Sequence, residues 1–327
     1  MTPSLIASFC LFPASAIGCY AFSRWMRSRA LGQHIRTRGP QSHVEKAGTP
    51  TMGGGVVLVL WSGAVWALGE RVGWPQHVGF VIASGLGFGL LGLADDVLSL
   101  RRRHSTGLTG PQKLALGSVL SVSLFFAFRG DVMVAQAVPF ASLHLVVPWV
   151  GMLFLSWILL VAATNTANLT DGLDGLAGGV YILVLGGLLW MVPTADNAML
   201  ILPLIATLAG FLWLNAHPAA LFLGDVGSFG VGGIIGALAL SNGLAFLLPL
   251  LAGVFVLEAA SVILQVGLRR LTGRRPFKMA PLHHHFEDSG GGPHWLPSAA
   301  WPEPKVTARF LLLQGAFVLL ALWAYGA

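Results

Sequence analysis

Long uncharged apolar runs dominate the sequence, most of them close to the length of a membrane-crossing helix. Such a helix needs about 20 mostly apolar residues. Ten segments approach this length: 4–22, 53–69, 78–94, 112–128, 146–164, 176–193, 198–214, 228–241, 244–268 and 308–325. Only 10% of the 327 residues are charged, whereas a soluble domain carries about 25%. These features predict an all-α, polytopic integral membrane protein, organised as a single transmembrane domain over residues 1–327.

Basic residues are concentrated in the connections that follow odd-numbered spans. Most lie within or beside 24–46, 101–113 and 269–309, and only Arg71 and Arg129 fall on the opposite side. Because cytoplasmic loops are rich in Lys and Arg, both termini are expected outside. The expected cytoplasmic loops are about 23–52, 95–111, 165–175, 215–227 and 269–307. The net charge of +6 favours contact with anionic lipid or phosphorylated substrates, without a nucleic-acid partner.

Five aspartates lie where the predicted spans reach the cytoplasmic surface: Asp95, Asp96, Asp171, Asp174 and Asp225. Adjacent carboxylates repel unless a cation or proton intervenes, so the Asp95–Asp96 pair indicates metal binding or base catalysis. Solvated helix ends are the simpler alternative. Acids gathered on one side favour a site that opens to the cytoplasm, because an ion-coupled transporter or lipid flippase more often places them mid-membrane.

Three further polar motifs border the predicted cytoplasmic loops. The glycine-rich stretch 48–55 follows Lys46, which is suited to meet a phosphate, although an ordinary glycine-rich helix entry would look similar. Glycines flank Asp225 in LFLGDVGS, which suits a metal ligand, and Phe222 is either a base-stacking or a core aromatic. Consecutive histidines at 283–285 cannot all face one metal from a helix, since successive side chains turn by about 100°. Contacts to phosphate or sugar are therefore favoured for them over a structural metal or a solvated cluster.

One acid, Glu258, lies within a predicted span. With Ser261 and Gln265 it forms a polar stripe at helical spacing. For this stripe we expect hydrogen bonds between helices rather than catalysis.

Five motifs occur in an order that is typical of a known family. They are GPQSHVEKAGTPTMGGG (39–55), LGLADD (91–96), NTANLTDGLDGLAGG (165–179), FLWLNAHPAALFLGDVGS (211–228) and RRPFKMAPLHHHFE (274–287). From about Gly32 to the last span, the chain resembles the polyprenyl-phosphate N-acetylhexosamine-1-phosphate transferases. The PLHHHFE motif resembles the muramoyl-pentapeptide branch more than the N-acetylglucosamine branch.

The sequence departs from the family pattern at two places. Ser99 stands where the family usually has a lysine, which favours transfer of that basic role to Arg101–Arg103. The stretch DSGGGPHWLPSAA, 288–300, precedes the WPEP segment and looks like an insertion that alters the shape of the cytoplasmic loop.

The resemblance implies a bacterial inner-membrane enzyme of peptidoglycan synthesis with its active site facing the cytoplasm. The implied reaction moves phospho-MurNAc-pentapeptide from UDP-MurNAc-pentapeptide to undecaprenyl phosphate, giving lipid I and UMP. The alternative within the family is transfer of N-acetylglucosamine 1-phosphate to the same lipid. The implied cofactor is Mg²⁺, which prefers oxygen ligands.

The resemblance also implies roles for individual residues. Asp225 is expected to bind Mg²⁺, with Asp95 as base or phosphate-positioning acid beside Asp96. His283, His284 and His285 are expected to contact pyrophosphate or sugar. The uridine diphosphate part is expected to contact Asn168, Asp171, Asp174, Asn215 and Phe222, with Lys46 and Thr51 lining the site. The peptide composition, the number of reaction steps and the oligomeric state, a homodimer included, are left open.

Overall fold

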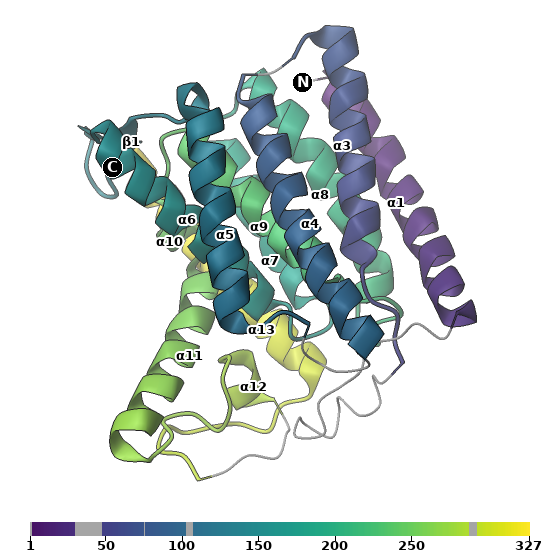
Figure 1. The fold of residues 1–327 in the computed structure, drawn as a ribbon, viewed down its shortest axis with the longest axis vertical. Coiled ribbons are helices and arrows are strands. Elements are labelled where there is room, and N and C mark those ends of the chain that lie inside the picture. Colours follow the sequence, from purple (N-terminus) through teal and green to yellow (C-terminus); the bar gives the residue numbers. More distant parts are fainter. Residues whose placement is uncertain (1, 30–47, 75, 103–106, 288–292) are drawn as a thin grey trace.

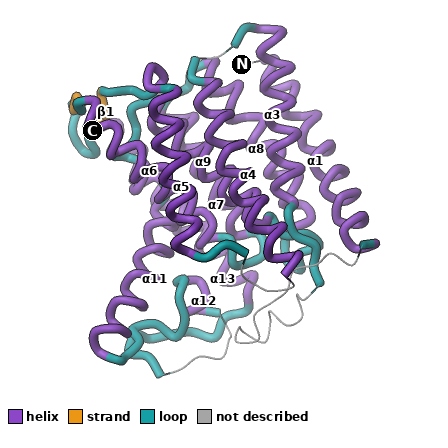
Figure 2. The backbone as a smooth tube through the Cα atoms, viewed as in Figure 1, coloured by secondary structure: helices purple, strands orange, loops and turns teal. Residues whose placement is uncertain are grey.

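Ten long helices form a bundle in the computed structural model, which describes residues 2–29, 48–74, 76–102, 107–287 and 293–327 (Figure 1). They are α1 (Thr2–Ser28), α3 (Gly53–Val72), α4 (Val78–Arg102), α5 (Gly110–Ala127), α6 (Trp149–Thr170), α7 (Leu176–Met191), α8 (Ala195–Asn215), α9 (Gly224–Ser241), α11 (Gly253–Thr272) and α13 (Glu303–Gly326). The short elements are η1 (Arg129–Asp131), α10 (Leu248–Leu251), α12 (His283–Phe286) and the antiparallel strands β1 (Ala135–Ala137) and β2 (His144–Val146). Figure 2 shows how little of the described chain is strand.

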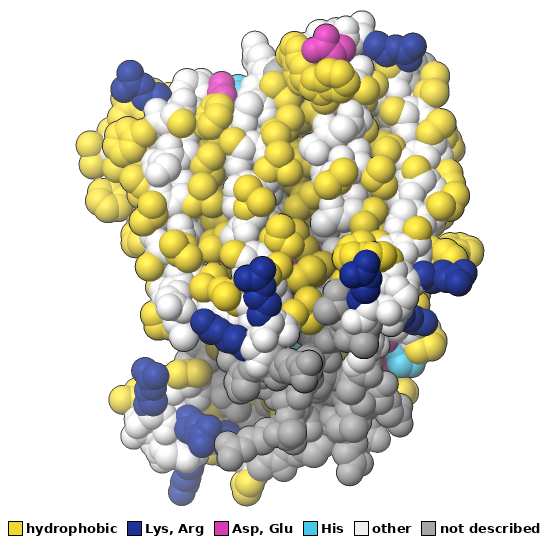
Figure 3. Space-filling model, turned by 45° about the vertical axis from the view of Figure 1, so that its right-hand side comes forward, with side chains coloured by type: hydrophobic (Ala, Val, Ile, Leu, Met, Phe, Trp, Pro, Cys, Tyr) yellow, Lys and Arg dark blue, Asp and Glu magenta, His cyan; other side chains and the backbone are white. Residues whose placement is uncertain are grey.

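Seven helices in the described part of the chain are long and apolar enough to cross a membrane: α1, α3, α4, α6, α8, α9 and α13. The helix α7 is apolar but shorter, at 16 residues. Large apolar side chains such as Phe9 and Trp213 are 81% and 76% exposed, which suits contact with lipid rather than water. Apolar side chains cover most of the face in Figure 3, and Lys and Arg gather mainly toward one end of it. The predicted all-α, polytopic membrane fold is confirmed.

Successive long helices run in alternating directions, so both ends of the chain lie at the same end of the bundle (Figure 1). The connections after α4, α6, α8 and α11 therefore lie together at the opposite end, as the alternation of spans predicts. The sidedness of the bundle in the membrane stays a prediction from the basic residues.

Several helices extend beyond the boundaries predicted from apolarity. The helix α4 continues to Arg102, so Asp95 and Asp96 lie within it rather than at its end. The stretch 95–102 has no Gly or Pro, and basic residues in a last turn interact favourably with the helix dipole, so it continues as helix. The span predicted at 244–268 is wrong as one helix, because non-helical backbone at Ala252 separates α10 from α11.

The helix α9 lies at the centre of the bundle and sets the position of the site. Every residue of α9 from Val226 to Ser241 is buried. Its start packs so closely on α4 that a Cβ at Gly92 would lie 2.1 Å from the carbonyl oxygen of Asp225. A glycine at 92 therefore allows the backbones to touch, which brings Asp95 and Asp96 beside Asp225.

Candidate functional site

The carboxylate of Asp96 binds the first turn of α9. Its Oδ1 accepts a hydrogen bond from the backbone N–H of Asp225 at 3.2 Å, and its Oδ2 accepts one from Val226 at 3.0 Å. The first N–H groups of a helix have no partner within the helix, and a carboxylate there also interacts favourably with the helix dipole. Asp96 therefore fixes the backbone that carries Asp225.

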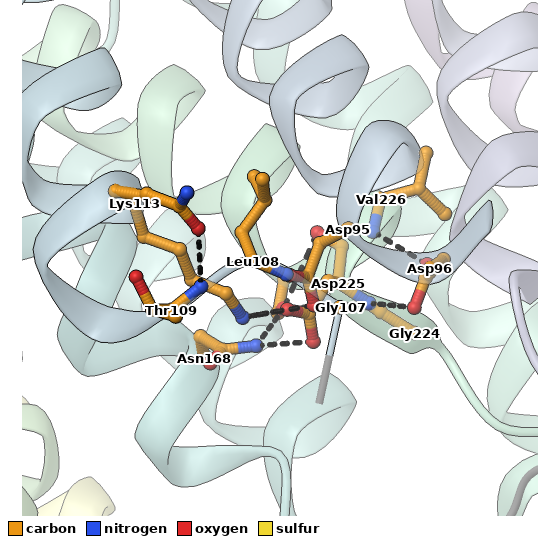
Figure 4. Close-up of polar contacts among 12 residues, drawn as sticks. Asp95, Asp96, Gly107, Leu108, Thr109, Lys113, Asn168, Gly224, Asp225 and Val226 are labelled. Atoms are coloured by element: carbon orange, nitrogen blue, oxygen red, sulfur yellow. Dashed lines mark hydrogen bonds and ion pairs between the residues drawn. The ribbon is translucent and has the colours of Figure 1, made fainter. Parts of the chain in front are cut away.

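Lys113 lies between two of the predicted catalytic carboxylates (Figure 4). Its Nζ is 2.9 Å from Asp95 Oδ2 and 2.5 Å from Asp225 Oδ2. On α6, Asn168 donates from Nδ2 to Asp225 Oδ1 at 2.7 Å and to Ser228 Oγ at 3.0 Å. Four helices, α4, α5, α6 and α9, thus contribute side chains to one polar network.

The turn that leads into α5 aims Lys113 at this network. The backbone N–H of Leu108 donates to Asp95 Oδ1 at 2.5 Å, which ties the turn to α4. Thr109 and Gln112 form a reciprocal capping box that starts α5 at Gly110, three residues before Lys113. Arg102 points its guanidinium elsewhere, donating to the carbonyl of residue 107 at 2.8 Å. Among the residues that the structure describes, the cation beside Asp95 is therefore Lys113, whereas Arg103 lies outside them.

The donor set of this network fits a divalent cation such as Mg²⁺. Asp95 and Asp225 supply four carboxylate oxygens against the single ammonium of Lys113, and Mg²⁺ prefers oxygen ligands. The side chains of Lys113 and Asp225 are 19% and 21% exposed, so a ligand reaches both. Among the three acids, Asp225 is the best placed to hold the ion, because Asp96 is committed to the α9 backbone and the side chain of Asp225 is more exposed than that of Asp95, 21% against 10%.

The glycine-rich stretch 48–55 lies directly beside the start of α9. The backbone N–H of Phe222 donates to the carbonyl of Pro50 at 2.8 Å, and the carbonyl of Phe222 accepts the backbone N–H of Gly53 at 2.9 Å. Thr51 is buried at this junction, with 4% exposure. Asp171 ends α6 one turn after Asn168, whose carbonyl accepts its backbone N–H at 3.2 Å. Thr51, Asp171 and Phe222 thus border the network, whereas Lys46 lies outside the described residues.

Asp174 belongs to a second polar network, with His217 and Glu303. Its Oδ2 is 3.0 Å from His217 Nδ1, and its backbone N–H donates to Glu303 Oε1 at 2.7 Å. Glu303 Oε2 is 3.7 Å from the same His217 nitrogen, and one ligand atom from each residue lies within 4.8 Å of the others. The network ties the loops after α6 and α8 to the start of α13.

Asn215 strengthens this second network from the last turn of α8. Its Oδ1 accepts the backbone N–H of Gly175 at 3.0 Å, and its Nδ2 donates to the carbonyl of Leu221 at 3.0 Å. Leu221 leads into the start of α9, so Asn215 links the TDGLDG loop to the segment that carries Asp225. In this structure Asp174 and Asn215 therefore hold loops around the site.

The first histidine of the PLHHHF motif is completely buried and faces two other motifs. His283 Nδ1 is 3.1 Å from Glu258 Oε1, and Glu258 Oε2 accepts the backbone N–H of Leu282 at 2.5 Å. The Nε2 of His283 has no hydrogen-bond partner among the described residues. That nitrogen faces the TDGLDG loop, since a Cβ at Gly172 would lie 2.2 Å from it. The polar stripe of α11 therefore binds the histidine loop instead of a neighbouring long helix.

The other two histidines have different partners. His284 Nδ1 is 2.9 Å from Glu287 Oε2. His285 Nδ1 accepts the backbone N–H of Lys278 at 3.0 Å, so its Nε2 carries the proton that it donates to Pro297 O at 2.9 Å. Burial lowers the pKa of His285, which keeps the ring in this neutral form. Both ring nitrogens of His285 thus bind the loop itself.

Sequence reasoning missed four residues of these networks: Lys113, His217, Glu258 as a partner of His283, and Glu303. Lys113 gave no clear signal, because it is the second residue of the predicted span 112–128 and a lysine at a span end is ordinary. His217 and Glu303 are 86 residues apart in the chain, so no local spacing pattern joins them.

Comparisons with known proteins find relatives that match most of the chain. The family model described as Glycosyl transferase family 4 matches residues 78–243, a range that contains Asp95, Lys113, Asn168 and Asp225. Three relatives share the name phospho-N-acetylmuramoyl-pentapeptide-transferase. The one from Thermodesulfovibrio yellowstonii is 37% identical over 322 residues, covering 91% of this chain and 86% of the relative. Those from Shouchella clausii and Rubrobacter xylanophilus are 37% and 38% identical and cover 95% and 93% of this chain and 94% and 92% of the relatives.

Identity at this level over nearly the whole length of both chains, together with the family model across α4 to α9, establishes the relationship. The chain belongs to the Glycosyl transferase family 4 and, within it, to the phospho-N-acetylmuramoyl-pentapeptide transferases.

Proposed function

We propose that this chain transfers phospho-MurNAc-pentapeptide from UDP-MurNAc-pentapeptide to undecaprenyl phosphate, giving lipid I and UMP. The observation that carries the proposal is the network of Asp95, Lys113, Asn168 and Asp225 at the end of the bundle opposite the chain termini. The basic residues predict that this end faces the bacterial cytoplasm, where a soluble sugar nucleotide is available.

The reaction brings together two phosphorylated substrates that repel each other. An oxygen of the lipid phosphate attacks the sugar-linked phosphorus, and the bond from that phosphorus to the oxygen of the UMP leaving group breaks. Asp225, with Asp95 beside it, would hold Mg²⁺, which supplies positive charge to the phosphates when bound. Lys113 adds a second positive charge at the same place, 2.5 Å from Asp225.

The neighbouring side chains set the geometry of this reaction. Asn168 holds one oxygen of Asp225 at 2.7 Å, and Asp96 holds its backbone at 3.2 Å, so the carboxylate has little freedom to turn. A lipid phosphate is largely ionised at neutral pH and needs no base to become a nucleophile. We therefore assign Asp95 to orienting Lys113, rather than to removing a proton.

The histidine loop is assigned to the sugar-nucleotide side of the site. His283 is held by Glu258 and faces the TDGLDG loop, which follows Asn168 on α6. The ring of His284 lies directly against the ring of His283, with their centroids 4.2 Å apart. This placement supports a contact from His284, whose side chain is 12% exposed, to the pyrophosphate or sugar, whereas the buried His283 and His285 are assigned to holding the loop.

Radiolabelled transfer to undecaprenyl phosphate tests the proposal, with UDP-MurNAc-pentapeptide and UDP-GlcNAc as parallel donors. We expect a labelled lipid product and UMP from the first donor only, and loss of product when EDTA removes divalent cations. Product from UDP-GlcNAc would instead assign the chain to N-acetylglucosamine 1-phosphate transfer. Turnover that persists in EDTA would contradict the role of Mg²⁺.

A further inference from the structure

A basic cavity lies beyond the end of α11 and takes no part in the chemistry described above. It encloses about 470 Å³, within the range of roughly 300–1,000 Å³ that is usual for ligand pockets. Its lining residues come from the end of α11 and from the inserted stretch: Gly273, Arg274, Arg275, Pro293, His294 and Trp295. The described part of the insertion, which begins at residue 293, therefore forms one wall of this cavity.

This wall is anchored to the histidine loop. The backbone N–H of Leu296 donates to the carbonyl of Pro276 at 3.0 Å. His285 Nε2 donates to Pro297 O at 2.9 Å, and the rings of His285 and His294 meet edge to face at 5.6 Å. Because His285 is only 2% exposed, the inserted stretch packs on a fixed surface.

The chemistry of the lining selects an anion that is attached to a partly apolar group. Arg274 and Arg275 each present a planar guanidinium, which binds carboxylate or phosphate through paired hydrogen bonds. Among the described residues that line the cavity, none is acidic. Trp295 adds an exposed indole, 52% accessible, against which an aliphatic or peptide group packs.

The cavity is close enough to the histidines to receive part of the same substrate. The rings of His283 and His284 are 4.2 Å apart, and His285, the next residue, contacts His294 of the cavity wall. An extended peptide of five residues spans roughly 17 Å. Because His285 follows His284 in the chain and contacts the cavity wall, a peptide on a sugar bound at His284 would be within reach of the cavity.

We propose that this cavity is a subsite for a carboxylate of the peptide carried by the sugar-nucleotide donor. The proposal rests on the function proposed above, and it adds that Arg274 and Arg275 recognise the peptide, whereas the Asp225 network recognises the phosphates. An anionic lipid headgroup has similar chemistry, but the direct contact of the cavity wall with the histidine loop favours the donor.

The test compares two donors in the full-length protein: UDP-MurNAc-pentapeptide and the same donor with its peptide carboxyl groups converted to amides. For the wild-type chain, we expect amidation to raise the KM roughly tenfold, as expected for loss of a charge-assisted hydrogen bond, with little change in kcat. Arg275→Gln should raise the KM of the acid donor to a similar value without further raising that of the amidated donor, because both changes remove one interaction. Arg269→Gln removes an equal charge at an exposed position of α11 that does not line the cavity, and it should leave both KM values unchanged.

Three results would overturn the subsite. They are equal KM values for the two donors in the wild-type chain, an equal rise for both donors in Arg275→Gln, and an unchanged KM in that variant with weaker binding to phosphatidylglycerol vesicles. The last result would assign the cavity to lipid headgroups.

If the wild-type chain transfers neither donor, the proposed function fails and calorimetry with the free pentapeptide tests the subsite alone. Binding that is lost in Arg275→Gln supports the subsite, and undiminished binding in that variant, or none to the wild-type chain, overturns it.

Discussion

Lys113 Nζ lies 2.5 Å from Asp225 Oδ2, although 112 residues separate them in the chain. The contact joins the start of α5 to the start of α9, and Asp95 on α4 lies 2.9 Å from the same nitrogen. An ammonium between two carboxylates neutralises their repulsion and also competes with any divalent cation for the same oxygens. Both consequences can be measured.

Lys113→Met should lower transfer at least roughly a hundredfold, because the phosphates lose a positive charge that is fixed in the site. The same variant should reach half-saturation at a lower Mg²⁺ concentration, since no ammonium competes for Asp225. Steady-state transfer over a Mg²⁺ titration measures both effects. Lys305→Met, an exposed lysine at the same end of the bundle, is the matched control and should change neither. Normal turnover in Lys113→Met would remove this residue from the site.

Asp96→Asn should lower both stability and turnover. The amide keeps one acceptor oxygen for the two N–H groups of Asp225 and Val226 and turns an NH₂ toward the other. Loss of a helix cap costs about 1 kcal/mol, and the displaced Asp225 should reduce transfer by roughly tenfold or more. Thermal unfolding and transfer assays measure the two effects, with Asp131→Asn at the opposite end as control. A variant that loses neither would show that Asp96 does not position α9.

The stability of the histidine loop should depend on pH through His285. Burial lowers the pKa of this residue, so the unfolded chain takes up its proton at a higher pH than the folded chain does. This contribution to stability is fully present above the ordinary histidine pKa. It is lost as the pH falls from that pKa through the lower pKa of His285 in the folded chain. Protonation also removes the Nδ1 acceptor that binds Lys278 at 3.0 Å.

The melting temperature of the wild-type chain should therefore fall between pH 7.5 and 5.5 by more than that of His285→Gln. His144→Gln, an exposed histidine on β2, should retain the wild-type pH dependence. An identical pH dependence in His285→Gln and the wild-type chain would contradict this role for His285.

Gly172→Ala should disrupt the contact between the TDGLDG loop and the histidine motif. The added Cβ would lie 2.2 Å from His283 Nε2, and His283 has no room to move because it is fully buried and held by Glu258. We expect transfer to fall at least tenfold, roughly the effect of displacing one substrate-positioning group. Gly186→Ala on α7 meets nothing within 4 Å, so transfer should be unchanged there. Equal activity in the two variants would show that the close packing is unimportant.

The sequence was sufficient to predict the fold class, because uninterrupted apolar runs and few charges leave only a helical membrane bundle. It also placed Asp95, Asp96, Asn168 and Asp225 in one candidate site, and the structure brings these four together. Helix ends were predicted less well, since apolarity stops at residue 94 whereas the hydrogen-bonded helix α4 continues to Arg102.

The partners of the predicted residues could not be read from the sequence. Asp174, which follows α6, contacts His217 after α8 and Glu303 at the start of α13. Glu258 on α11 contacts His283 in the loop that follows this helix. These contacts depend on tertiary packing and leave no local spacing pattern.

The most direct measurement is Mg²⁺-dependent transfer by Asp225→Asn beside Asp196→Asn. The first change removes the charge at the centre of the network, and the second removes an equal charge at the opposite end, where Asp196 accepts the backbone N–H of Gln76 at 2.9 Å. Loss of several kcal/mol of transition-state stabilisation should lower turnover of Asp225→Asn at least roughly a thousandfold, with folding and membrane insertion retained. Asp196→Asn should transfer at nearly the wild-type rate. Near-normal Mg²⁺-dependent turnover in Asp225→Asn, or an equal loss in both variants, would contradict the assignment of the site.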